Sequence, residues 1–191
     1  MSTTVVINKP AGTAAGNVLI ASIALNGTTI TTAPSGWVQI AAIITINPRL
    51  YAYYRVAGAG EPATYTWTLS AAVANSGGIA RYSGVNNANP LDATTTTATA
   101  TVVTSLAVPA VTTVSPGAML VGAAAINSSN ETILITSPAG MTERWDLGGK
   151  RQDYADALQP AAGSSGNKTW TWSSGSARDA AGWLAALKPA P

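Results

Sequence analysis

Residues 64–69 read TYTWTL, and residues 168–173 read KTWTWS. In both stretches a large apolar residue alternates with a polar one. This period places the aromatic residues on one face of a strand and the threonines on the other. Because the chain has six tryptophans and no phenylalanine, tryptophan has to supply the large core volume. The pattern predicts two strands with Trp67 and Trp172 in the core; a row of aromatics that stacks on sugars is the alternative.

The sequence also repeats itself. Four short motifs recur in the same order, offset by 101 to 105 residues. Such a regular offset predicts two pseudo-repeats, residues 1–91 and 101–191, joined by a Thr/Ala-rich connection, residues 92–104, which we expect to be a polar loop. The matching pairs are GNVLI (16–20) with GAMLV (117–121), APSGW (33–37) with SPAGM (137–141), YTWT (65–68) with WTWS (170–173), and GIARY (78–82) with GWLAA (182–186).

Turn-forming residues divide each repeat into about six short apolar or alternating segments, and no segment reads as a helix. About twelve such strands predict an all-β, two-sheet antiparallel β-sandwich, jelly-roll-like, that forms a single domain over residues 1–191. The expected strands are 3–8, 17–25, 37–46, 49–56, 63–69 and 77–84 in the first repeat, and 101–108, 117–126, 141–147, 151–159, 168–174 and 180–188 in the second.

Charge is sparse, with 10 basic and 8 acidic residues and a net charge of +2. This small basic excess does not indicate binding to nucleic acid. No segment is long and apolar enough to insert into a membrane as a helix. The start, MSTTVVINKP, lacks the pattern of a signal peptide. A surface solvated by threonine, serine and asparagine is typical of proteins in assemblies or outside the cell, since soluble domains carry more charge on average.

Catalytic groups are scarce. Histidine and cysteine are absent, which removes the commonest general base and metal ligand and all thiol chemistry. The carboxylates Glu143, Asp146, Asp153 and Asp156 could bracket a hairpin and hold calcium or act as a glycosidase pair. Basic residues lie between them, so ion pairing on an exposed hairpin is the stronger interpretation. We expect no enzyme, and no catalytic, cofactor or metal site.

The segment LYAYYRV, residues 50–56, holds the best candidate contact residues. Alternation places Leu50 and Tyr54 on a core face, and Tyr51, Tyr53 and Arg55 on a face expected to point outward. Tyrosine and arginine are enriched at protein interfaces, where a flat apolar surface carries a polar tip. We therefore predict that Tyr51, Tyr53 and Arg55 contact a partner or a glycan; an ordinary half-exposed sheet face is the alternative.

The strand expected over residues 17–25 is apolar on both faces. A simple two-layer sandwich covers only one face of a strand, so the other must be covered by a loop, by the other repeat or by another subunit. If a subunit covers it, the chain self-associates.

The motifs TAPSGW, YAYYRVAGAGEPATYTWT, GGIARYSGV and PAGMTERW resemble a β-sandwich module of phage structural proteins and bacterial surface-associated proteins. The resemblance covers nearly the whole chain and implies a non-enzymatic role on a virion surface or outside the cell. It favours a virion structural protein, first a capsid decoration or head-surface protein that binds itself or other virion proteins. The alternatives are a phage tail-fibre or receptor-binding module, or a carbohydrate-binding or adhesin module that binds a cell-surface glycan.

Overall fold

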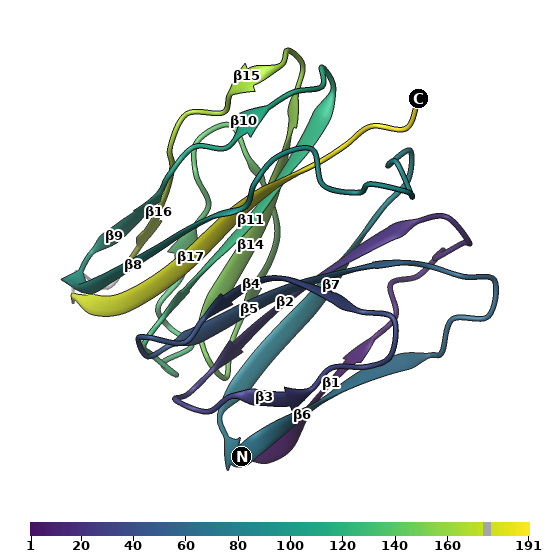
Figure 1. The fold of residues 1–191 in the computed structure, drawn as a ribbon. Helices are drawn as coiled ribbons and strands as arrows, with labels where there is room; N and C mark the ends of the chain where they lie inside the picture. Colours follow the sequence, from purple (N-terminus) through teal and green to yellow (C-terminus); the bar gives the residue numbers. More distant parts are fainter. Residues whose placement is uncertain (174–176) are drawn as a thin grey trace.

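The computed structural model describes residues 1–173 and 177–191, and these form an all-β structure of antiparallel sheets (Figure 1). The described ranges hold seventeen strands, more than the twelve expected. Their bounds are β1 Ser2–Asn8, β2 Val18–Leu25, β3 Ile30–Thr32, β4 Val38–Ile43, β5 Arg49–Val56, β6 Thr64–Val73, β7 Asn75–Tyr82, β8 Thr96–Val103, β9 Ser105–Val108, β10 Thr112–Thr113, β11 Ala118–Ile126, β12 Ile135–Thr136, β13 Thr142–Leu147, β14 Gln152–Gln159, β15 Gly163–Ser164, β16 Lys168–Trp172 and β17 Arg178–Leu187.

Each half of the chain builds a small sandwich with the same strand order. In the first half, the sheet β4-β5-β2-β7 faces the sheet β1-β6-β3. In the second half, β13-β14-β11-β17 repeats the larger sheet and β12-β16-β9 repeats the smaller one. The second half adds β8 beside β17 and a separate two-stranded sheet, β10-β15.

The strands that sequence reasoning missed are short or lie in threonine-rich segments. β3, β10, β12 and β15 span only two or three residues each, which is too few for a period to show. The connection expected to be a polar loop is wrong over residues 96–100, because residues 96–103 pair with β17 as β8. Threonine favours extended backbone, and the edge of β17 supplies hydrogen-bonding partners that a loop would lack.

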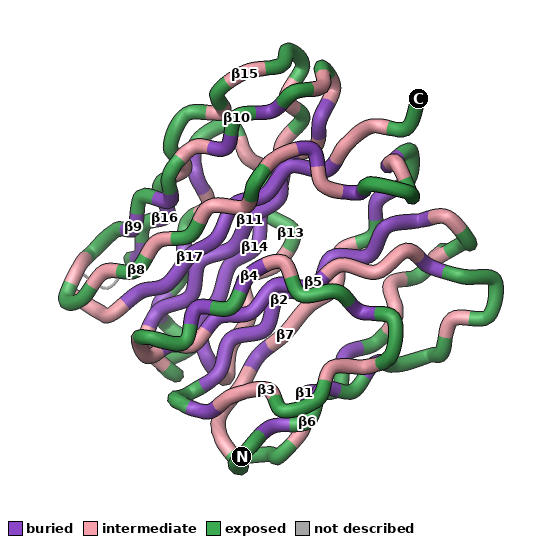
Figure 2. The backbone as a smooth tube through the Cα atoms, in the orientation of Figure 1, coloured by how far each residue is buried: buried purple, intermediate pink, exposed green. Residues whose placement is uncertain are grey.

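The two sandwiches pack against each other through their larger sheets, so the molecule has four layers of strands. One hydrophobic cluster lies inside the first half, a second inside the second half, and a third joins the two large sheets. Buried residues gather along β2, β11 and β17 in the middle of the molecule (Figure 2). The chain thus buries the large sheets on both faces.

Strand β2 shows this most clearly, because all eight of its residues are buried. Leu19 and Ile23 point into the first sandwich, whereas Val18 and Ile20 point into the cluster between the repeats. Of the three coverings expected for the second face, the other repeat supplies it. The doubly apolar strand is therefore no argument for another subunit.

Small residues let the two large sheets approach closely. The layer between them contains Ala24 and Ala52 from the first repeat and Ala123 and Ala181 from the second. At Gly78 of β7, an added Cβ would lie 2.5 Å from Trp145 Cε2, much closer than atoms can pack. A large side chain of this layer, such as Trp145, therefore fits only where the opposite sheet has a small residue, such as Gly78.

The tryptophans of the alternating strands are buried, as the sequence predicts. Trp67 is 0% exposed and Trp172 is 6% exposed, while Thr66 and Thr171 beside them face solvent. Trp67 packs edge-on against Trp37, with ring centroids 5.1 Å apart. These rings fill the first sandwich and form no exposed platform for sugars.

We predict that Trp67→Ala lowers the free energy of unfolding by about 3–5 kcal/mol, since it removes a fully buried ring and leaves a cavity. Denaturant unfolding followed by circular dichroism measures the change. Thr66→Ala on the solvent face of the same strand is the matched control and should stay within about 0.5 kcal/mol. Equal losses in the two variants would contradict the core position of Trp67.

Candidate functional site

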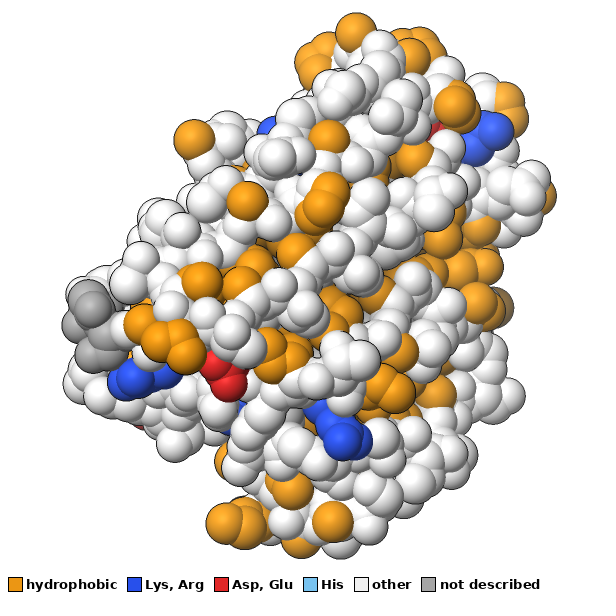
Figure 3. Space-filling view, turned by 60° about the vertical axis from the view of Figure 1, so that its left-hand side comes forward, with side chains coloured by type: hydrophobic (Ala, Val, Ile, Leu, Met, Phe, Trp, Pro, Cys, Tyr) orange, Lys and Arg blue, Asp and Glu red, His pale blue; other side chains and the backbone are white. Residues whose placement is uncertain are grey.

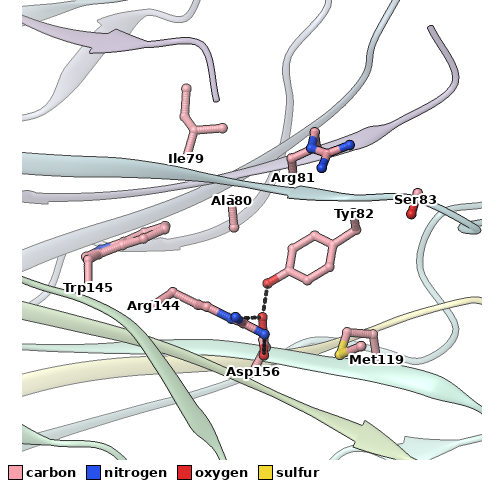
Figure 4. A pocket seen from close by; sticks show the side chains of 9 residues that line it. All are labelled: Ile79, Ala80, Arg81, Tyr82, Ser83, Met119, Arg144, Trp145 and Asp156. Atoms are coloured by element: carbon pink, nitrogen blue, oxygen red, sulfur yellow. Dashed lines mark hydrogen bonds and ion pairs between the residues drawn. The ribbon is translucent and has the colours of Figure 1, made fainter. Parts of the chain in front are cut away.

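A cleft of about 440 Å³ opens where the two repeats meet (Figure 4). One wall is the edge strand β7 with the turn that follows it, and the other wall comes from β11, β13 and β14 of the second repeat. The cleft therefore exists only because the repeats pack together. Its lining residues are Ile79, Ala80, Arg81, Tyr82, Ser83, Met119, Arg144, Trp145 and Asp156.

Asp156 is the polar centre of the cleft. Arg144 binds it with two hydrogen bonds, Nε to Oδ2 at 2.7 Å and Nη2 to Oδ1 at 2.8 Å. The hydroxyl of Tyr82 donates to Oδ2 at 2.7 Å and lies 3.0 Å from the hydroxyl of Tyr154. Because the Asp156 side chain is 4% exposed, this bidentate pair provides the compensation that a buried carboxylate needs.

Burial and hydrogen bonding favour the protonated forms of Tyr82, Tyr154 and Arg144 in this network. Burial raises the pKa of Tyr82 and Tyr154 well above the ordinary value, and the neighbouring Asp156 adds to the effect. The hydrogen bonds to Asp156 raise the pKa of Arg144 further. Both phenols therefore stay protonated at neutral pH and hold their hydrogen bonds in this network.

A β-bulge places Arg144. In the pairing of β13 with β14, Glu143 lies opposite Ala155 and Trp145 lies opposite Tyr154, so Arg144 is the extra residue. Bulges re-aim side chains in this way. The ring of Trp145 stacks on Tyr154 with centroids 4.3 Å apart and an interplanar angle of 14°. Arg144 remains 48% exposed in its side chain, so part of its guanidinium faces the cleft.

The structure overturns the outward orientation predicted for Tyr51 and Tyr53. Both are 4% exposed and lie inside the first sandwich. The alternation is as predicted, but both faces of β5 are covered: Leu50 and Ala52 face the other repeat, and the tyrosines face the outer sheet. Burial raises the pKa of Tyr53 to about 12. These two rings are core residues and offer no surface to a partner.

Arg55, the third predicted contact residue, binds other residues of the same chain. Its Nε donates to both carboxylate oxygens of Glu61, at 2.9 and 2.8 Å, and its Nη1 donates to the Ser35 carbonyl. Glu61 also accepts hydrogen bonds from the Tyr65 hydroxyl and the Gly58 N–H. Burial alone would raise the pKa of Glu61, but these hydrogen bonds outweigh it and lower the pKa to about 2. This cluster fixes the connection between β5 and β6.

The acidic hairpin β13–β14 is ion-paired, as the sequence predicts, through Arg144 with Asp156 and Arg151 with Asp146. The expected exposure of this hairpin is wrong for Asp153 and Asp156. Both residues are buried. In the described part of the chain, no group of acidic side chains is placed to hold a metal ion. No helix there is long and apolar enough to cross a membrane.

The side chain of Asp153, a residue of β14 in this hairpin, points toward the outer sheet of the second sandwich and has no exposed surface. The hydroxyl of Ser137 donates to its Oδ1 at 2.8 Å, and Trp170 Nε1 donates to the same oxygen at 2.6 Å. Burial raises the pKa of Asp153 to about 7, although these two hydrogen bonds act in the opposite direction. The carboxyl group joins β14 to the outer sheet of the second sandwich.

Sequence reasoning did not bring the cleft residues together. In the sequence, Asp156 is only one of four candidate carboxylates, and no pattern distinguishes Tyr82 or Trp145 as a site residue. A signal was present, since GGIARYSGV contains Tyr82 and PAGMTERW contains Arg144 and Trp145. Two repeats that meet face to face place these motifs side by side, but their pattern does not show which faces meet.

Comparison with protein-family models, with curated proteins and with solved structures finds no match to this chain. The functional reasoning therefore depends on the geometry of the molecule and on the motifs of its sequence.

We predict that Asp153 contributes a decrease in the free energy of unfolding as the pH rises from about 4 to about 7. An ordinary aspartate ionises near pH 4 in the unfolded chain, whereas the carboxyl group of Asp153 in the folded protein keeps its proton to about pH 7. The folded state thus binds the extra proton in this interval, and stability decreases by up to about 1.4 kcal/mol per pH unit as the pH rises.

Asp153→Asn keeps an acceptor for Trp170 and cannot ionise, so its unfolding free energy should lack this component. Denaturant unfolding of both proteins from pH 4 to pH 8 measures the difference between them. A constant difference across the range would contradict the raised pKa of Asp153.

Proposed function

We propose that the chain is a non-enzymatic structural protein of a virion surface, a capsid decoration protein that acts by binding itself and other virion proteins. The observation that carries the proposal is that the buried carboxylate of the cleft is engaged by side chains of the protein itself. Its carboxylate, Asp156, is held by Arg144 and Tyr82 with both oxygens occupied, so the polar groups at the meeting of the repeats support the fold. The proposal includes no nucleic-acid partner and no insertion into a membrane.

The solvent-facing side of the outer sheets also supports a structural role. On β6, Thr64, Thr66 and Thr68 face solvent, and on β16 Thr169 and Thr171 do the same. Contacts made by uncharged hydroxyl and methyl groups are not weakened by salt screening, which suits a surface that stays in an assembly. The motifs that resemble phage structural proteins favour the virion over other extracellular assemblies.

A second candidate is a tail-fibre or receptor-binding module, or a carbohydrate-binding or adhesin module on a bacterial surface. The half-exposed guanidinium of Arg144 favours it, because two of its five N–H donors bind Asp156 and the others remain. With Trp145 and Met119 beside it, the cleft combines charged donors with apolar surface. This combination suits a sugar that carries a carboxylate.

The proposed function predicts that the chain is a component of virions released from the source cells, at a copy number in fixed proportion to the major capsid protein. Quantitative mass spectrometry across a density gradient measures this ratio, with an abundant cytosolic protein of the host as the control for contamination.

A chain found in the cell envelope and absent from the virion band would contradict the decoration role. A chain found in virions at only a few copies, with binding to acidic glycans on an array that Arg144→Ala abolishes, would favour the receptor-binding module instead.

A further inference from the structure

Strand β8 is an addition to the shared repeat pattern, with no counterpart in the first half. It forms one edge of the five-stranded sheet, and β17 is its only partner within residues 1–173 and 177–191. Within the same ranges, the backbone of residues 97–101 makes no hydrogen bond outside its strand ladder. In an antiparallel pair, alternate N–H and C=O groups point away from the partner, so the outer edge of β8 presents free backbone groups.

The side chains of β8 suit pairing with another strand. Its sequence is TTATATVV, and residues 93–130 as a whole contain no charged side chain. Ala98 and Ala100 pack partly against the core of the second sandwich, which fixes the strand in place. Thr97 and Thr99 are exposed, and Val102 is 73% exposed. The strand is thus held on one side and open on the other.

Two of the other long sheet edges carry features that block pairing. β13 bears Glu143, Arg144 and Asp146 and contains a bulge. β4 has an irregular register between Gln39 and Ala41. Charges and bulges are the means by which proteins protect their edges, and an edge without them is a template for another strand. In its regular part, residues 96–100, β8 has neither.

A groove of about 230 Å³ runs beside β8, between the edges of the two large sheets. Residues 42–45 at the end of β4 line one side, and Thr97, Ala98 and Thr99 line the other. Ile44 is 48% exposed there. The side of the molecule that carries β8 in Figure 1 is turned forward in Figure 3, where most of the surface is uncharged. A strand added to β8 would cover apolar surface and desolvate few charges.

We propose that β8 is the self-association surface of the protein, and that two copies pair β8 with β8 in antiparallel orientation about a twofold axis. The strand is self-complementary: when the axis passes through Ala98, Thr97 of each copy lies opposite Thr99 of the other. Threonine pairs across strands are favourable, and no like charges meet. The two five-stranded sheets become one continuous sheet.

That the partner of β8 is a second copy of the chain rests on the self-association included in the proposed function. The role of β8 as the pairing strand follows from its own edge and can be tested apart from the virion role. An isologous contact of this kind closes as a dimer, because each edge is used up by its partner.

The test is sedimentation velocity of the purified full chain over a wide concentration range, with Thr99→Lys as the variant. The wild type should form a dimer that persists in high salt, since no ion pair holds it. Thr99→Lys should raise the dissociation constant about tenfold or more, because it places two like charges at the pairing edge. Thr66→Lys, at an exposed threonine of β6, is the matched control and should leave the constant within about twofold.

Crosslinking gives a second measurement. The chain has no cysteine, so a disulfide dimer of a single-cysteine variant reports a contact between identical positions. In the twofold β8 pair, Ala98 lies opposite Ala98, so Ala98→Cys should crosslink to itself. Thr97 lies opposite Thr99, so a mixture of Thr97→Cys and Thr99→Cys should form the mixed disulfide, whereas Thr66→Cys should not crosslink.

A wild type that stays monomeric at high concentration would overturn the proposal, as would the absence of both the Ala98→Cys crosslink and the mixed disulfide between positions 97 and 99. A dimer that Thr66→Lys disrupts and Thr99→Lys leaves intact would place self-association elsewhere, with the proposed function still standing. Unfolding midpoints of the lysine variants close to that of the wild type show that each is folded.

Discussion

Burial of the second face of β2 and β11 is the constraint on which the rest of the structure depends. Each strand is central in its sheet and apolar on both faces, so one sandwich covers only half of its apolar surface. The two repeats cover these faces for each other through a layer in which alanines oppose Trp183 and Tyr154. Apolar area buried in this way supplies most of the free energy that favours the native state.

Polar groups within this apolar layer fix how the repeats meet. Trp183 Nε1 donates to the Ser22 hydroxyl of the other repeat. The ammonium group of Lys150 hydrogen-bonds to Asn26 and Asn127, which follow β2 and β11 at corresponding ends. Burial lowers the pKa of Lys150 to about 8. Since an unpaired buried polar group is costly, a shifted register would leave these groups without partners. The cleft around Asp156 is one consequence of the register that they hold.

The sequence was informative where a pattern had one physical interpretation. Alternation with threonine predicted the buried Trp67, and the doubly apolar β2 predicted a second covering layer. It was ambiguous where both strand faces are buried: a period of two separates Tyr51 and Tyr53 from Leu50 but does not show which face meets water. The composition of the Thr/Ala connection predicts a loop but suits an edge strand equally, so composition alone does not separate the two. The cleft depends on which faces of the repeats meet, and motifs within each repeat do not contain that information.

Hydrogen exchange followed by mass spectrometry tests the central claim most directly, because it compares the opening of the two repeats in the intact protein. If each repeat depends on the other for the second face of its central strand, peptides covering residues 18–25 and 119–126 should open together. Their exchange should be equally slow and should respond equally to denaturant, as expected for one cooperative unit. Fast exchange in one of these strands while the other stays protected would contradict the account.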